Sequence, residues 1–126
     1  LTVMPLDVTH KALMQREWLE KLKTLNTPVG DATYGMLSFY ERHDVEKYGT
    51  TGGPLHDPTV IAYLLRPELF EGKFVNVEVE THSALAIGMT VMDWWGVTDR
   101  QPNATVMHSI NADAFYDLLY DSLARL

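Results

Sequence analysis

The sequence predicts an α/β fold in which helices come first, strands follow and a final helix closes the chain. Apolar residues recur at helical spacing in the first half, from Met14 through Leu25. Val75, Val77 and Val79 then alternate with polar residues, which is the period of a half-buried strand. Residues 1–126 carry no internal repeat and no Gly/Ser linker, so we expect one α/β unit or part of one.

The chain opens on an apolar stretch, residues 1–6, that has the character of a strand, and two long helices are predicted after it. Thr9 can cap a first helix that begins near His10 and stops at residues 26–28, Asn-Thr-Pro. Asp31 can cap a second helix that continues to about residue 48, where a glycine follows. A strand at the very start of a chain needs neighbours, so we expect further sequence before it.

The third predicted helix is short and follows a glycine-containing loop. Asp57 and Pro58 have the pattern of an N-cap followed by the first helical position. The helix then covers residues 59–65 and is apolar, so we expect it to be buried, and Pro67 closes it.

The last third of the chain is predicted to be mainly strand. Residues 89–93 and 105–110 are strand candidates in addition to the alternating valines. Asn111 then caps a final helix whose apolar residues share one face. That face comprises Phe115, Leu118, Leu119, Leu123 and Leu126.

Composition excludes several classes of partner. The 126 residues carry 10 Lys plus Arg against 17 Asp plus Glu, a net charge of −7, which disfavours nucleic acid and anionic membranes. The same balance permits a divalent cation or a neutral small molecule. There is no cysteine, which excludes disulfides and thiolate metal sites and is compatible with a cytoplasmic protein. No apolar run approaches the roughly 20 residues of a membrane span.

The most informative segment is residues 52–58, Gly-Gly-Pro-Leu-His-Asp-Pro. It places His56 beside Asp57 at the start of the third helix. An imidazole moves protons near neutral pH, and a carboxylate can hold a hard metal ion. The simpler alternatives are an ordinary helix cap for Asp57 and a hydrogen-bonded histidine for His56. Spacing alone leaves both interpretations open.

Other aromatic and histidine residues carry weaker signals. Tyr48 lies beside the glycine loop and is a candidate ligand contact, whereas Tyr34 and Tyr40 have core spacing. The adjacent Trp94 and Trp95 should face opposite sides of a strand end, so one of them is expected at a packing or interface surface. The remaining histidines show no helical pairing with the one at position 56, which argues against a helical phosphohydrolase.

Several segments together resemble the C-terminal part of inosine-uridine preferring nucleoside hydrolases. They are residues 6–11 (Leu-Asp-Val-Thr-His-Lys), 52–58, 62–65 (Ala-Tyr-Leu-Leu), 77–80 (Val-Glu-Val-Glu), 88–91 (Gly-Met-Thr-Val) and 102–104 (Pro-Asn-Ala). Their order and spacing match along nearly the whole chain. Residues 1–126 therefore look like the C-terminal portion of a single nucleoside hydrolase domain, with an α/β fold that resembles a Rossmann arrangement.

The resemblance implies hydrolysis of the N-glycosidic bond of ribonucleosides to ribose and free base, with Ca²⁺ bound to the ribose hydroxyls and the attacking water. It implies that Asp57 is a calcium ligand and that His56 protonates or stabilises the leaving base. Residues from Asp44 to Tyr48 would belong to a flap over the base, with Tyr48 as the main contact. A homo-oligomer, nucleoside salvage and a cytoplasmic location are further implications.

The sequence also departs from the family pattern. The aspartate-rich N-terminal motif that supplies most calcium ligands and the base that activates water is absent, as is the segment that grips the ribose. Asp44 stands where pyrimidine-preferring members tend to have glutamine, and the arginine that many members carry before Gly88 is missing. We therefore expect this segment alone to be inactive without the missing N-terminal half. The alternative is a non-catalytic α/β domain that reuses the scaffold for binding or assembly.

Overall fold

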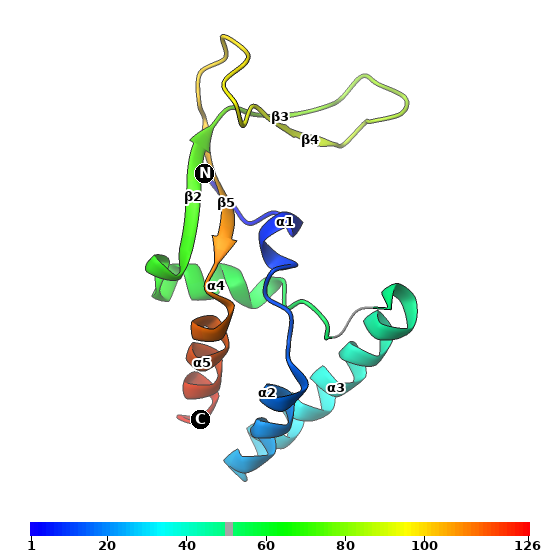
Figure 1. Cartoon of the computed structure of the whole chain (residues 1–126), viewed down its shortest axis with the longest axis vertical. Helices are drawn as coiled ribbons and strands as arrows, with labels where there is room; N and C mark the ends of the chain where they lie inside the picture. Colours follow the sequence, from blue (N-terminus) through cyan, green and yellow to red (C-terminus); the bar gives the residue numbers. More distant parts are fainter. Residues whose placement is uncertain (50–51) are drawn as a thin grey trace.

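The computed structural model describes residues 1–49 and 52–126, with the side chains of residues 41–45, 47 and 48 outside that description. The molecule is elongated, with strands towards one end and most of the helices towards the other (Figure 1). Helices precede the main strands and a final helix ends the chain, so the α/β prediction is confirmed.

The main sheet has three strands in the order β1-β5-β2. β5 (Ala104–Ile110) lies at the centre, parallel to β1 (Thr2–Val3) and antiparallel to β2 (Phe70–Val75). A separate hairpin pairs β3 (Val77–Val79) with β4 (Thr90–Met92) and projects beyond the sheet (Figure 1). The strands expected at residues 89–93 and 105–110 are confirmed.

The alternating valines form two strands rather than one, because the chain leaves the main sheet at Asn76. This side chain is 7% exposed, and its amide nitrogen donates to the carbonyl oxygen of Gln101 at 3.0 Å. The backbone carbonyl oxygen of Asn76 accepts from the backbone N–H of Asp93 at 2.9 Å. These bonds replace the ladder partners that residue 76 would have had in a continuous strand.

The first predicted helix is wrong in its start. Thr9 does not cap it but ends a single turn, α1 (Leu6–Thr9). Helix α2 begins only at Arg16 (Arg16–Lys21) and passes into a 3₁₀ turn, η1 (Leu22–Leu25). Residues 10–12 form a turn and a bend, and Leu13 then pairs with Pro54 of the glycine loop, as described below. The expected stop at residues 26–28 is confirmed, since Asn26 has a left-handed backbone with φ +50°.

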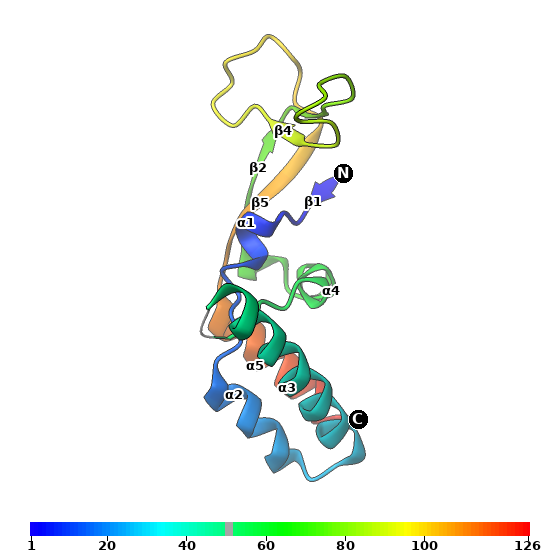
Figure 2. The ribbon, with the colours of Figure 1, turned by 90° about the vertical axis from the view of Figure 1, so that its right-hand side faces the viewer.

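Helix α3 (Pro28–Tyr48) begins three residues before the predicted cap. The hydroxyl oxygen of Thr27 accepts from the backbone N–H of Gly30 at 3.1 Å, which is the bond that an N-cap makes. Pro28 follows at the first helical position, where its missing N–H costs nothing. Asp31 is therefore in the first turn rather than at the cap. Helices α2 and α3 lie side by side (Figures 1 and 2).

The remaining helices are α4 (Asp57–Leu65), the 3₁₀ turn η2 (Pro67–Leu69) and α5 (Ala112–Leu123). The Asn111 cap is confirmed, because its side-chain oxygen accepts from the backbone N–H of Ala114 at 3.1 Å. The expected burial of α4 is wrong: Leu64 is 72% exposed and Leu65 is 61% exposed. The apolar composition of α4 thus corresponds to a surface that the described residues leave uncovered.

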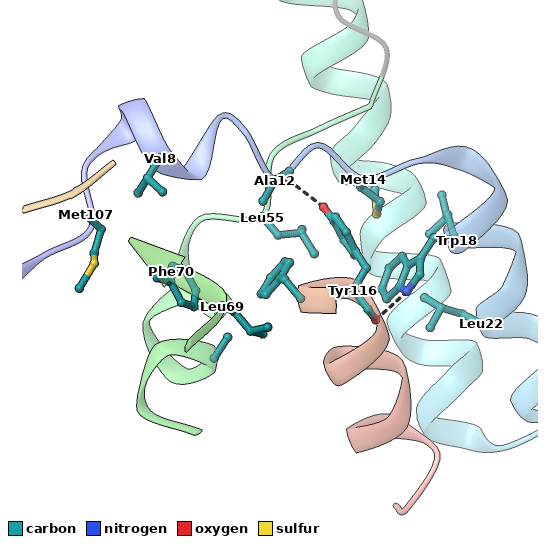
Figure 3. Close-up of a cluster of buried hydrophobic side chains, with 13 residues drawn as sticks. Val8, Ala12, Met14, Trp18, Leu22, Leu55, Leu69, Phe70, Met107 and Tyr116 are labelled. Atoms are coloured by element: carbon teal, nitrogen blue, oxygen red, sulfur yellow. Dashed lines mark hydrogen bonds between the residues drawn. The ribbon is translucent and has the colours of Figure 1, made fainter. Parts of the chain in front are cut away.

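The core gathers buried side chains from α1, the segment between α1 and α2, α2, η1, the loop before α4, α4, η2, β2, β5 and α5 (Figure 3). The rings of Trp18 and Tyr116 lie 4.8 Å apart, and the indole N–H of Trp18 donates to the backbone carbonyl of Tyr116 at 2.9 Å. The hydroxyl of Tyr116 donates to the carbonyl of Ala12 at 2.9 Å. Burial raises the pKa of the Tyr116 phenol, so it remains a donor across the physiological range. This cluster ties the final helix to the segment that leads into the site.

Among the described residues, none of the helices combines the length and the apolar character that a bilayer crossing requires.

Candidate functional site

The glycine loop is held in place by a short antiparallel contact with the segment before α2. Leu13 pairs with Pro54, and the backbone N–H of Met14 donates to the carbonyl of Gly53 at 3.1 Å. From the other side, the hydroxyl of Tyr40 on α3 donates to the carbonyl of Pro54 at 3.1 Å. Residues 52–55 are buried. The approach to His56 is therefore fixed by two elements that are distant in sequence.

His56 is half-buried and lies at the N-terminal end of α4. Its ring nitrogen Nδ1 lies 2.7 Å from the hydroxyl oxygen of Thr9 at the end of α1. Its backbone carbonyl accepts from Thr59, at 2.6 Å from the hydroxyl and 3.2 Å from the backbone N–H. The ring of His10 meets that of His56 edge-on, with centroids 5.3 Å apart. Both the backbone and the imidazole of His56 are thus anchored.

Asp57 is the first residue of α4, and His56 occupies the cap position in its place. The carboxylate is exposed. Among the residues that the structure describes, it has no hydrogen-bond or ion-pair partner. A capping role for its side chain is therefore not observed, and both of its oxygens are available to a ligand.

The other two predicted site residues lie on α3. Asp44 and Tyr48 belong to its last turns, and their side chains lie outside the described residues. Their expected roles in a flap over the base stay predictions.

The described part of the chain does not bring together a complete set of calcium ligands. Calcium takes six to eight oxygen ligands. Within the described parts of the chain, no three His, Asp or Glu side chains come together as a metal ion would need. Asp57 offers one carboxylate, and the remaining ligands would have to come from elsewhere.

An apolar groove runs between α4 and α5 and opens beside Asp57. It has a volume of about 440 Å³. Its lining consists of Asp57, Pro58, Ile61, Ala62, Leu65, Phe115, Leu118, Leu119 and Ser122. The groove contains part of the exposed apolar surface of α4, at Ile61 and Leu65.

Trp94 and Trp95 lie in the turn after β4, and the ammonium group of Lys73 is 5.3 Å from the ring centroid of Trp94. The ring of Trp94 meets that of His108 edge-on at a centroid distance of 5.1 Å. Trp95 is 82% exposed and lies 5.9 Å from the ammonium group of Lys73. An interface role for Trp95 stays a prediction.

Sequence reasoning missed the contribution of Thr9 and His10 to this site. Thr9 has the sequence pattern of a helix cap, and His10 shows no helical spacing relative to His56. Thr9 and His56 are 47 positions apart in the sequence, and no helical or strand periodicity links them. The available signal was that residues 6–11 are among the segments that carry the family resemblance.

Comparison with known proteins connects this geometry to one family. Residues 1–117 match the model of the inosine-uridine preferring nucleoside hydrolases. The pyrimidine-specific ribonucleoside hydrolase RihA of Citrobacter koseri is 47% identical over 120 residues, which is 94% of this chain and 38% of that protein. An uncharacterised protein of Schizosaccharomyces pombe is 39% identical over 126 residues, 100% of this chain and 41% of its own length. The chain thus spans about two fifths of the length of these curated relatives.

Solved structures show the same fold. The plant nucleoside hydrolase PpNRh1 superposes with a TM-score of 0.84 at 23% identity, over 99% of this chain and 41% of that one. The purine-preferring ribonucleoside hydrolase of Gardnerella vaginalis superposes with a TM-score of 0.83 at 23% identity, over 98% of this chain and 39% of that one. The expected nucleoside hydrolase fold is confirmed, and the chain belongs to the inosine-uridine preferring nucleoside hydrolase family.

Proposed function

We propose that this chain contributes one wall of the active site of an enzyme that hydrolyses the N-glycosidic bond of ribonucleosides to ribose and free base. The observation that carries the proposal is the His56–Asp57 pair at the start of α4, within the matched residues 1–117. The imidazole is anchored through Nδ1, and the carboxylate is exposed and unpartnered among the described residues. A proton donor needs a ring held in a fixed orientation, and a metal ligand needs an accessible carboxylate, so this arrangement supports both roles.

His56 supplies the proton in this proposal. The bond between ribose C1′ and the base nitrogen breaks with its electron pair on the base, and the oxygen of a water molecule bonds to C1′. The imidazolium of His56 gives its proton to the base as negative charge develops there, which is general acid catalysis. The carboxylate that takes the proton from the water would belong to the aspartate-rich motif of the family, which this sequence does not contain.

Asp57 would contribute one oxygen ligand to the calcium ion that the family resemblance implies. When bound, calcium would hold the attacking water and lower its pKa, so that a carboxylate could remove its proton more easily. The other ligands would come from the part of the protein that this chain does not span. Asp44 and Tyr48 would contact the base.

The apolar groove between α4 and α5 supports the proposal that a larger part of the fold covers this chain. A face with Ile61 at 58% and Leu65 at 61% exposure is unfavourable in water. Because the relatives are about two and a half times as long as this chain, the portion they add is the simplest occupant. Homo-oligomer formation, a role in salvage and a cytoplasmic location stay predictions from the resemblance.

The substrate class follows the relatives by analogy. RihA of Citrobacter koseri is described as pyrimidine-specific, which makes uridine the first substrate to test. Asp44 stands where pyrimidine-preferring members tend to have glutamine, so inosine is the necessary second substrate.

The test is an assay of ribose release from uridine and inosine. One arm uses this chain alone. The other uses an assembled enzyme, in which the chain is combined with the part of the Citrobacter koseri protein that it does not match. We expect calcium-dependent hydrolysis only in the assembled enzyme, and its loss in both His56→Ala and Asp57→Ala. Hydrolysis that survives either substitution would contradict the proposed roles, and hydrolysis by neither form would favour the non-catalytic binding domain.

A further inference from the structure

The hydroxyl of Thr9 is positioned to control which nitrogen of His56 is left for the substrate. Its oxygen lies 2.7 Å from Nδ1, whereas Thr9 itself is only 2% exposed. Water therefore has little access to this side of the ring. The hydrogen bond occupies Nδ1, so Nε2 is the ring nitrogen that remains for a ligand.

The hydroxyl is free to act as donor or acceptor. Its other neighbour is the carbonyl oxygen of Leu6 at 3.5 Å, which is at the outer limit of a hydrogen bond. When Nε2 gives up a proton, the neutral ring that remains carries its proton on Nδ1, so the hydroxyl accepts from Nδ1–H both before and after the transfer. The Thr9 hydroxyl can meanwhile donate to the carbonyl oxygen of Leu6.

We infer that Thr9 is a positioning residue for the proton transfer by His56: it holds the ring through Nδ1 and reserves Nε2 for the leaving base. The hydrogen bond made by one ring nitrogen of a histidine determines the state of the other, so this contact sets the direction of proton transfer. The inference rests on the proposed function in one respect, namely that the group facing Nε2 is the leaving base of a nucleoside. The Thr9–His56 hydrogen bond itself does not depend on it.

The first measurement is the pair of ring-nitrogen chemical shifts of His56 in ¹⁵N-labelled chain. Thr9→Val keeps the side-chain shape and removes the hydroxyl, so the Nδ1 shift should move and the tautomer ratio should change. Thr9→Ser should restore the wild-type shifts. Thr59→Val is the matched control, because Thr59 is also fully buried and bonds to His56, but through the backbone carbonyl. It should leave the ring shifts unchanged. Unchanged ring shifts in Thr9→Val would overturn the inference.

The second measurement is kinetic and uses the assembled enzyme. Loss of a hydrogen bond to a charged partner predicts a fall in kcat of about ten- to a hundredfold in Thr9→Val, with KM nearly unchanged. Thr9→Ser should recover most of the rate. A fall in Thr9→Ser as large as in Thr9→Val would mean that packing of the methyl group matters and would overturn the inference. Ring shifts that respond to Thr9→Val in a protein without hydrolytic activity would uphold the positioning of Nε2 and sink the proposed function alone.

Discussion

Gly52 lies against the backbone of Met14 so closely that a Cβ at position 52 would be 2.1 Å from the Met14 carbonyl oxygen. The same glycine has a left-handed backbone, with φ +87°. Gly52 immediately precedes Gly53, whose carbonyl accepts from the backbone N–H of Met14. These contacts with Met14 hold the loop that leads to His56. Two independent constraints, space and conformation, therefore require glycine here.

Substitution Gly52→Ala should lower the free energy of unfolding by about 3 kcal/mol or more, because strain at positive φ adds to a clash with backbone that cannot rotate away. Gly88→Ala is the matched control: φ is +85° there, but nothing lies within 4 Å of the added Cβ. Gly88→Ala should lower the free energy of unfolding only by the strain of positive φ, about 1 kcal/mol. Denaturant unfolding of both variants measures the difference. Equal losses in the two variants would show that the contact with Met14 carries no energy.

Removal of the Asp57 charge should weaken calcium binding by the assembled enzyme. Asp57→Asn keeps the shape and one oxygen but loses the negative charge, so the calcium affinity should fall at least about tenfold. Chelation of calcium should abolish ribose release by the unsubstituted enzyme, and added calcium should restore it. Isothermal titration with calcium provides the affinity.

The control for that substitution is Asp113→Asn, which also changes an exposed aspartate in the first turn of a helix, α5. It should leave calcium affinity unchanged. Equal affinities for Asp57→Asn and the unsubstituted protein would rule out Asp57 as a ligand.

The sequence was informative where local chemistry decides the structure. The Asn111 cap and the strand over residues 105–110 follow from side-chain capping and from hydrophobic patterning, and both are observed. The prediction that Thr9 caps a helix is wrong. A threonine before an apolar helical pattern looks the same in the sequence whether it caps a helix or forms a hydrogen bond with a distant histidine. Only the tertiary contact with His56 distinguishes the two cases.

The exposure of α4 could not be predicted for a related reason. An apolar helix predicts that something covers it, but its sequence does not say whether the covering element belongs to the same chain. The placement of His56 and Asp57 at the start of α4 was predictable from the local sequence, and their roles stay predictions from the family resemblance. The anchoring of the His56 ring could be seen only in the fold.

The apolar groove predicts that one substitution has a much larger effect in the assembled enzyme than in this chain alone. Leu65→Gln replaces a side chain that is 61% exposed in this chain, so the free energy of unfolding of the chain alone should change by no more than about 0.5 kcal/mol. If the added part of the enzyme covers the groove, the same substitution should weaken the assembled form by about 2 kcal/mol. Thermal unfolding of both forms compares them. Leu85→Gln, at a position 98% exposed in the hairpin loop, should affect neither; an equal response of the two variants would argue against groove burial.

The loop after β4 should open on acidification, because Asp93 organises it as a carboxylate. Its oxygens accept from the Thr98 hydroxyl at 2.6 Å, the Val97 N–H at 2.8 Å and the Thr98 N–H at 2.9 Å. The Thr98 hydroxyl, followed by these backbone donors, holds the pKa of Asp93 below its ordinary value of 3.8. A lowered pKa in the folded state means that the stabilisation is complete above the ordinary value and is lost as the pH falls through the folded-state pKa.

Hydrogen-exchange protection factors of Val97 and Thr98 report this directly. They should be constant from neutral pH down to about pH 4 and should fall below it as the carboxylate is protonated. In Asp93→Asn the side chain keeps one acceptor oxygen but no charge, so protection should be low already at neutral pH and should not change on acidification. Asp121→Asn, an exposed position on α5, should reproduce the unsubstituted profile. A profile for Asp93→Asn that overlays the unsubstituted one would show that the charge of Asp93 does not hold the loop.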